Sequence, residues 1–212
     1  MKFSEDMLLL YAVTDRAWTG RLTLYSQVEQ ALMGGVTMVQ LREKDLSEAE
    51  IIAQARELLE LRHGYTFPLI INDNADIALK VGADGVHVGI EDAPVADIRK
   101  RAGRDFIIGA TAKTAEQAKA AEAAGADYLG VGAVFPSPTK QNAIRITTAQ
   151  LKTICESVKI PAVAIGGIGL HNMNEITGGG MKGIAVVSAI FAAEDIKSAA
   201  EQLKERAQAL CG

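Results

Sequence analysis

Charged and polar side chains follow three consecutive hydrophobic runs of the chain. Arg42 and Lys44 come directly after one run. Asn72 and Asp73 end and follow the next run, and Asp92 lies shortly after a third. Two cations and two carboxylates suit a bound diphosphate, because carboxylates hold Mg²⁺ through hard oxygen ligands and cations neutralise the remaining phosphate oxygens. Surface salt bridges are the alternative for any one of these residues alone, but their joint placement favours a Mg²⁺-assisted diphosphate site.

A loop of hydroxyl, proline and lysine side chains follows the glycine-rich stretch Gly130-Val131-Gly132. Its sequence is Phe135-Pro136-Ser137-Pro138-Thr139-Lys140. Such a loop can grip an anion and close over a substrate. A surface loop with an exposed lysine is the other interpretation, and the neighbouring diphosphate residues favour the first.

Short β-branched runs alternate with helical stretches along the whole chain, which is typical of βαβ units and a parallel sheet. About eight such runs are present, the number that closes a (β/α)8 barrel. The fold class is therefore predicted as α/β, a single-domain (β/α)8 TIM barrel that spans residues 1–212. Active sites of this fold lie at the carboxyl ends of the strands, where the polar clusters occur. The expected strands are Leu8–Thr14, Met38–Arg42, Pro68–Asn72, Gly85–Gly89, Phe106–Thr111, Tyr128–Val134, Ala162–Gly167 and Ile184–Ile190.

Helix signals support the same alternation. Residues 47–61 are expected to form a helix in which Ser47 and Glu50 make a capping box. Residues 114–124 are expected to form another, which stops at Gly125. An open doubly wound sheet is the rival architecture, but its Gly-x-Gly-x-x-Gly turn is missing after the first strand, where Thr14-Asp15-Arg16 stands instead.

Glycines and a hydroxyl follow the last two expected strands. The sequences are Ile165-Gly166-Gly167-Ile168 and Val186-Val187-Ser188-Ala189-Ile190. Glycines let backbone amides approach an anion, and the loops after strands seven and eight are the recurrent phosphate site of this fold. Glycines needed only for tight turns are the weaker alternative, because Ser188 adds a hydroxyl donor. Two phosphate sites imply two phosphorylated substrates or one long substrate.

Composition limits the function classes. Hydrophobic residues make up 49% of the 212 residues and the formal net charge is −4, which argues against disorder and against a nucleic-acid partner. Cys155 and Cys211 have no metal or redox spacing, so both are expected to be free thiols in a reducing compartment. No signal peptide or membrane span is recognised, so a cytoplasmic protein without membrane partners is expected. A homo-oligomer is possible.

The chain resembles the thiamine phosphate synthases over almost its whole length. The shared motifs include Tyr11-Ala12-Val13-Thr14-Asp15-Arg16, Gln40-Leu41-Arg42-Glu43-Lys44, Ile71-Asn72-Asp73-Asn74, Gly85-Val86-His87-Val88-Gly89 with Asp92, Ile108-Gly109-Ala110-Thr111, Gly130-Val131-Gly132, Thr139-Lys140 and Val187-Ser188. The resemblance implies a transferase that joins hydroxymethylpyrimidine diphosphate to hydroxyethylthiazole phosphate, or to its carboxylated form, with release of diphosphate.

The same resemblance implies a role for each matching residue. Asp73 and Asp92 would be the Mg²⁺ ligands. Gln40 and His87 would face the aminopyrimidine, with no general-base role for His87. The remaining roles are diphosphate contacts for Arg42, Lys44, Asn72, Thr111 and Lys140, a loop lining for Ser137 and Thr139, and a thiazole-phosphate site at Gly167, Val187 and Ser188.

Three departures from the family pattern stand out. Thr111 replaces a common serine and keeps its hydroxyl. Gln141-Asn142-Ala143 replaces Lys-Asp-Ala after Lys140, and Ala133 replaces a proline before the Val-Phe-Pro turn. Thr111 is expected still to donate a hydrogen bond, whereas the changes at Ala133 and at residues 141–143 bear on how the loop after Lys140 closes.

Two other functions fit parts of the pattern. A thiazole tautomerase has the same fold and monophosphate site, but it relies on a histidine shortly after strand five, where this chain has Lys113. It also has no need of two metal-binding carboxylates. A non-catalytic binder of phosphorylated ligands is the third reading, which rests only on the altered loop.

Overall fold

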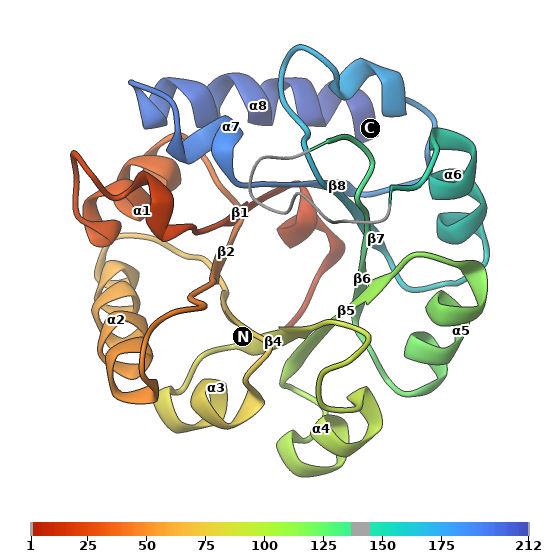
Figure 1. Ribbon diagram of the computed structural model, residues 1–212, viewed down its shortest axis with the longest axis horizontal. Coiled ribbons are helices and arrows are strands. Elements are labelled where there is room, and N and C mark those ends of the chain that lie inside the picture. The colour runs from red at the N-terminus through yellow and green to blue at the C-terminus, as the bar shows by residue number, and fades with distance from the viewer. Residues whose placement is uncertain (1, 137–144, 212) are drawn as a thin grey trace.

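A closed barrel of eight parallel strands forms the centre of the molecule in the computed structural model, which describes residues 2–136 and 145–211. Each strand pairs with its neighbours in sequence, and β1 pairs with β8 to close the ring. Helices surround the ring, as Figure 1 shows. The predicted fold class is therefore confirmed. The strands are β1 (Leu10–Val13), β2 (Met38–Leu41), β3 (Leu69–Asn72), β4 (Gly85–Val88), β5 (Ile107–Ala112), β6 (Tyr128–Gly132), β7 (Ala162–Ile165) and β8 (Gly183–Val186).

Helices follow the strands and cover their outer faces. Short 3-10 turns begin the chain and occur in three connections. The helices are α1 (Leu24–Met33), α2 (Glu48–Glu60), α3 (Ala75–Val81), α4 (Val95–Ala102), α5 (Ala115–Ala123), α6 (Thr148–Glu156), α7 (Ser188–Phe191) and α8 (Ile196–Cys211), and the 3-10 turns are η1 (Glu5–Leu8), η2 (Arg16–Trp18), η3 (Leu61–His63) and η4 (Met173–Ile176).

Two apolar layers hold the barrel together. The larger layer packs the outward side chains of the strands against the helices. The smaller layer fills the barrel interior and includes Leu8, Tyr11, Met38, Ile70 and Tyr128. Strands buried on both faces read as continuous apolar runs, which is why the sequence pattern located them.

Helix ends agree with the sequence signals. Ser47 and Glu50 form the expected capping box at the start of α2. Thr114 caps α5, and the chain leaves that helix at Gly125, whose φ is +94°. There the N–H of Gly125 donates to Glu122 and that of Ala126 donates to Ala121, a pairing that satisfies the last carbonyls of the helix.

Most expected strands extend one to four residues beyond the observed ones, and two of them include helical residues. Leu8 belongs to η1, not to β1, and β8 ends at Val186. The carbonyl of Val187 accepts hydrogen bonds from Ile190 and Phe191, so residues 188–191 form the short helix α7. Strand propensity of the β-branched residues was therefore overridden by local helical hydrogen bonding.

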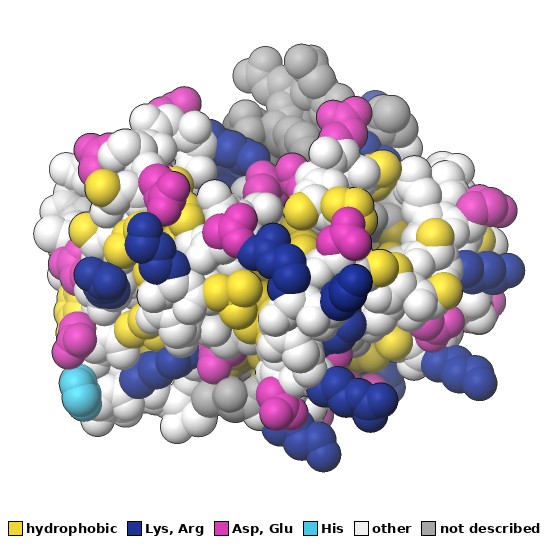
Figure 2. All heavy atoms as spheres, turned by 90° about the horizontal axis from the view of Figure 1, so that it is seen from below, with side chains coloured by type: hydrophobic (Ala, Val, Ile, Leu, Met, Phe, Trp, Pro, Cys, Tyr) yellow, Lys and Arg dark blue, Asp and Glu magenta, His cyan; other side chains and the backbone are white. Residues whose placement is uncertain are grey.

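The cysteines, the helix lengths and the surface charges of the described residues bear on the remaining expectations. Cys155 and Cys211 are both free. No described helix is long and apolar enough to cross a membrane. On the face in Figure 2, lysine and arginine side chains alternate with aspartate and glutamate side chains.

Candidate active site

Lys44, Asp73 and Asp92 come from three different loops and gather at the carboxyl-terminal end of the barrel. Lys44 Nζ donates to Asp73 Oδ2 at 2.5 Å. The carboxylates of Asp73 and Asp92 are near enough to influence each other's pKa. Asp92 Oδ2 also accepts from the backbone N–H of Gly89 at 2.7 Å. The structure thus brings together the two carboxylates and one of the cations that the sequence singled out.

The backbone at Asp73 has an unusual conformation. Its φ is +60°, in the left-handed region that non-glycine residues seldom adopt. Its N–H donates to the carbonyl of His87 at 2.8 Å, which ties the end of β3 to the adjacent strand β4. Such strained residues cluster at functional sites, and the Asp73 side chain here accepts a hydrogen bond from Lys44.

The pKa values of the two carboxylates are shifted in opposite directions, that of Asp92 upward and that of Asp73 downward. Partial burial raises the pKa of Asp92, and the neighbouring charge of Asp73 adds to this, against a hydrogen bond from Gly89. Burial alone would also raise the pKa of Asp73, but hydrogen bonds with Lys44 and Asp92 outweigh it and leave this pKa below its ordinary value. Two carboxylates this close repel each other unless a proton or a cation lies between them.

This donor set fits a Mg²⁺ ion. In proteins Mg²⁺ is commonly held by one or two carboxylates together with substrate phosphates and water. Within residues 2–136 and 145–211, no group of three or more His, Cys, Asp or Glu side chains could hold a metal ion. Asp73 and Asp92 are thus suited to a metal that completes its coordination with a ligand's phosphate oxygens.

Arg42 lies on the same side of the barrel, at the end of β2. Its Nη1 donates to Asp15 Oδ2 at 3.1 Å, and its backbone N–H donates to the hydroxyl of Thr14 at 3.0 Å. The Arg42 side chain is 23% exposed and that of Asp15 is 16% exposed. The guanidinium is therefore held in place, but solvent still reaches it.

A chain of buried hydrogen bonds crosses the barrel interior beneath these charges. Gln40 Nε2 donates to the Tyr11 hydroxyl at 2.6 Å, and the hydroxyls of Tyr11 and Tyr128 lie 2.9 Å apart. His87 Nδ1 is 3.1 Å from the Tyr128 hydroxyl, and His87 Nε2 is 3.1 Å from the hydroxyl of Thr111. The chain thus links five side chains from five strands.

One direction of donation satisfies every member of this chain. The Nε2 group of Gln40 can only donate, so the Tyr11 hydroxyl accepts from it and donates to the Tyr128 hydroxyl. The Tyr128 hydroxyl in turn donates to His87 Nδ1. His87 then carries its proton on Nε2 and donates to Thr111. This leaves the Thr111 hydroxyl proton free to donate to an anion.

The three titratable side chains of this hydrogen-bonded network, His87, Tyr11 and Tyr128, are neutral near pH 7. Burial lowers the pKa of His87 to about 4, although the charge of Asp73 opposes the shift. Burial also raises the pKa of Tyr11 and of Tyr128 above the ordinary range. His87 is therefore an uncharged hydrogen-bonding residue. The sequence analysis likewise gives it no general-base role.

Glycines make room for the buried side chains. A Cβ at Gly109 would lie 2.2 Å from Tyr128 Cζ and 2.5 Å from His87 Nδ1. A Cβ at Gly130 would lie 2.8 Å from His87 Cε1. Large rings occupy the barrel interior only because β5 and β6 have no side chain at these two positions.

The loops after β7 and β8 form the second part of the candidate site. Gly166 and Gly167 have φ values of +106° and +63°, which favour glycine. The buried Asn172 donates from Nδ2 to the carbonyl of Gly167 at 2.9 Å and holds this loop. Ser188, which follows Val187, is the first residue of α7, where backbone N–H groups have no partner inside the helix.

Three predicted contacts cannot be placed. Ser137, Thr139 and Lys140 lie outside the described residues. Asn72 is half-buried at the end of β3 and is paired in register with His87. Direct substrate contacts of all these residues stay predictions.

Sequence reasoning missed several residues of the site. Tyr11 and Tyr128 read as ordinary strand residues, and only the barrel closure shows that their hydroxyls meet. The pairing of Asp15 with Arg42 spans 27 positions and has no local signature. Asn172 had a usable signal, since an asparagine after a Gly-Gly turn often bonds to nearby backbone groups.

The closed barrel and the charges at its carboxyl-terminal end define a (β/α)8-barrel enzyme with phosphate-binding features. The family model described as thiamine monophosphate synthase matches residues 10–190. The chain therefore belongs to the thiamine monophosphate synthase family, and the prediction of a thiamine phosphate synthase, a transferase, is confirmed.

Named relatives agree over almost the full length. The thiamine-phosphate synthase of Ruminiclostridium cellulolyticum is 48% identical over 196 residues, which cover 92% of this chain and 93% of that protein. That of Clostridium acetobutylicum is 47% identical over 191 residues, or 90% of each chain. The solved thiamine phosphate pyrophosphorylase of Pyrococcus furiosus superposes with a TM-score of 0.89 at 40% identity and covers 98% of this chain and 99% of that one.

Proposed function

We propose that this protein joins hydroxymethylpyrimidine diphosphate to a hydroxyethylthiazole phosphate and releases thiamine phosphate and diphosphate. The observation that carries the proposal is the cluster of Lys44, Asp73 and Asp92 beside Arg42, within a member of the thiamine monophosphate synthase family. Breaking the bond between the pyrimidine methylene and the diphosphate creates two opposite charges. The electron-rich aminopyrimidine can delocalise the cation, so the protein's main task is to stabilise the departing anion.

The diphosphate is stabilised by side chains that follow or end five strands, β2 to β6. Asp73 and Asp92 would hold Mg²⁺, which when bound supplies positive charge to the diphosphate oxygens. Arg42 and Lys44 approach the same oxygens as cations, and Asn72, Thr111 and Lys140 are proposed as further contacts. The direction of donation in the buried chain supports the role of Thr111, because its proton is not needed by His87.

The aminopyrimidine is proposed to lie above Gln40 and His87. Both side chains are almost fully buried, and His87 pairs in register with Asn72, the residue before Asp73. Neutral hydrogen-bonding groups at this position can orient the ring without competing for a proton. The thiazole nitrogen is already unprotonated, so correct positioning replaces the need for a general base.

Metal dependence provides the first experiment. Purified protein is given both substrates with Mg²⁺ and then with a chelator, and diphosphate and thiamine phosphate are measured together. Release of both products in step, only with metal and both substrates, is the expected result. Thiazole phosphate binding without any diphosphate release would contradict the proposal and favour the tautomerase or the non-catalytic binder.

The thiazole phosphate is proposed to bind at Gly167, Val187 and Ser188. Ser188→Ala is expected to raise the KM for thiazole phosphate about tenfold, because one hydroxyl contact to a charged phosphate is lost. The KM for the pyrimidine diphosphate should change little. Steady-state kinetics with each substrate varied in turn measure the split. Ser198→Ala, at a partly exposed position of α8 and outside the candidate site, is the matched control.

An equal rise of both KM values in Ser188→Ala would argue against two separate phosphate sites. Cytoplasmic location, assembly into a homo-oligomer, and the choice between carboxylated and decarboxylated thiazole stay predictions. The small-molecule partners themselves follow from the family.

A further inference from the structure

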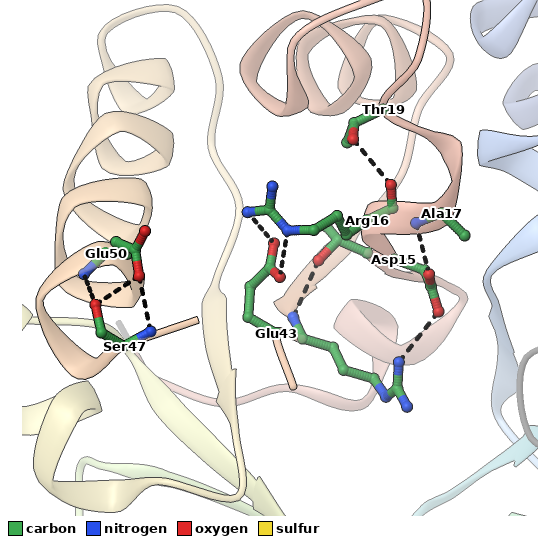
Figure 3. A network of polar contacts seen from close by, with 9 residues as sticks. Asp15, Arg16, Ala17, Thr19, Glu43, Ser47 and Glu50 are labelled. Carbon is green, nitrogen blue, oxygen red and sulfur yellow. Dashed lines mark hydrogen bonds and ion pairs between the residues drawn. The ribbon is translucent and has the colours of Figure 1, made fainter. Parts of the chain in front are cut away.

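Three consecutive residues after β1 contact the segment that carries Arg42. The hydroxyl of Thr14 accepts from the backbone N–H of Arg42 at 3.0 Å, and Asp15 Oδ2 accepts from Arg42 Nη1 at 3.1 Å. Arg16 donates from Nε and Nη2 to the two carboxylate oxygens of Glu43 at 3.1 and 3.4 Å. Figure 3 shows Asp15 and Arg16 reaching to opposite sides, with Glu43 facing Arg16. The segment after β1 is thus joined to Arg42 and Glu43 by a hydrogen bond from the Arg42 backbone to the Thr14 hydroxyl and by two ion pairs.

Asp15 is itself fixed at both oxygens. While Oδ2 accepts from Arg42, Oδ1 accepts from the N–H of Ala17 at 2.9 Å and caps the short turn η2. A carboxylate held in this way cannot swing with its partner. The orientation of the Arg42 guanidinium is therefore set by the turn after β1 as well as by its own loop.

Glu43, the residue after Arg42, is held by its ion pair with Arg16. Its side chain is only 3% exposed, whereas that of Arg16 is 46% exposed. A charged carboxylate withdrawn from water needs a partner, and the forked guanidinium of Arg16 supplies two donors. Because Glu43 follows Arg42 directly, this pair fixes the path of the backbone just after Arg42.

We infer that Asp15 and Arg16 are positioning residues, which hold Arg42 in the orientation that meets the departing diphosphate. The inference rests on the proposed function. The contact with Asp15 engages Nη1, and the planar fork of the guanidinium leaves its other edge for phosphate oxygens. A preoriented arginine loses less rotamer freedom when the anion binds.

The charge of Asp15 makes this inference testable. A carboxylate beside a diphosphate site weakens anion binding through simple Coulomb repulsion. If that repulsion dominated, removing the charge of Asp15 would strengthen diphosphate binding. If Asp15 acts by positioning Arg42, removing its charge weakens diphosphate binding.

Asp15→Asn separates these two effects. Asparagine retains an oxygen that can accept from Ala17, so the turn η2 and the melting temperature should be preserved. The expected result is a rise of about tenfold in the KM for the pyrimidine diphosphate, because the guanidinium is no longer held in the productive geometry. The Kd of inorganic diphosphate in the presence of Mg²⁺, measured by calorimetry, should rise in parallel. The KM for thiazole phosphate should stay unchanged.

Arg16 is tested by graded replacement. Arg16→Ala should raise the KM for the pyrimidine diphosphate by a smaller factor than Asp15→Asn, since it acts only through Glu43. Arg16→Lys should recover part of that loss, because one charged donor to Glu43 returns. Glu5→Gln is the control: Glu5 pairs with Lys182 at 3.5 Å before the start of β1, at the opposite end of the barrel, and its loss should change neither KM.

Unchanged or tighter diphosphate binding in Asp15→Asn would overturn the inference, as would equal rises in the KM values of both substrates. A wrong proposed function would give a different experimental result from a wrong role for Asp15. The wild-type protein would then form no thiamine phosphate, while the comparison of diphosphate binding between wild type and Asp15→Asn would still decide whether Asp15 orients Arg42.

Discussion

Asp92→Ala is expected to lower kcat/KM for thiamine phosphate formation by about 10³-fold, the loss that follows when a metal-assisted site gives up several kcal/mol of charge stabilisation. Asp92 contributes one of two carboxylates that lie close enough to share a cation. Burial and the charge of Asp73 raise the pKa of Asp92, so its ionised form is costly without a cation nearby. Turnover is measured by product formation across a series of Mg²⁺ concentrations.

Asp92→Asn distinguishes the charge from the fold of the loop. Asparagine can still accept the hydrogen bond from the N–H of Gly89, which is 2.7 Å from Asp92 Oδ2. We therefore expect Asp92→Asn to melt like the wild type and yet to lose most of its activity. Asp97→Asn, at an exposed position on α4, is the matched control. An Asp92→Asn protein with normal activity at low Mg²⁺ would show that Asp92 holds no metal.

The barrel could be predicted because its signals are local. Each buried strand reads as a short apolar run, and caps such as Ser47 with Glu50 mark where a helix begins. The polar clusters after the strands then locate the site, since parallel strands bring their carboxyl ends to one edge. The same reasoning predicts that Lys44 and Asp73 lie together, and in the structure their side chains are 2.5 Å apart.

The remaining features depend on contacts between distant parts of the chain. Tyr11 and Tyr128 are 117 positions apart, and their hydroxyls meet only because the barrel closes. The strand expected at residues 184–190 was wrong because of a local contact instead. Its β-branched residues favour an extended chain, but the carbonyl of Val187 begins a helical turn at the end of β8. Sequence periodicity contains neither kind of information.

Gly109→Ala is expected to destabilise the barrel by about 3 kcal/mol, through overpacking at a position that the sequence marks only as a glycine in a strand. The new methyl would lie 2.2 Å from Tyr128 Cζ and 2.5 Å from His87 Nδ1, and both rings are buried. For a chain of 212 residues this corresponds to a fall in Tm of roughly 6–12 °C, measured by thermal unfolding. Activity should fall as well, because the shifted His87 would no longer orient Thr111.

Two further variants identify the cause of that loss. Gly64→Ala is the control, since its methyl would meet nothing closer than the Leu61 carbonyl at 4.0 Å, and its Tm should stay near that of the wild type. Tyr128→Leu removes the ring atoms that the Gly109 methyl would meet. The double variant with Gly109→Ala should therefore lose less stability than the sum of the two single variants. Strict additivity would contradict a direct clash between positions 109 and 128, and would assign the effect to the contact with His87 or to the strand backbone.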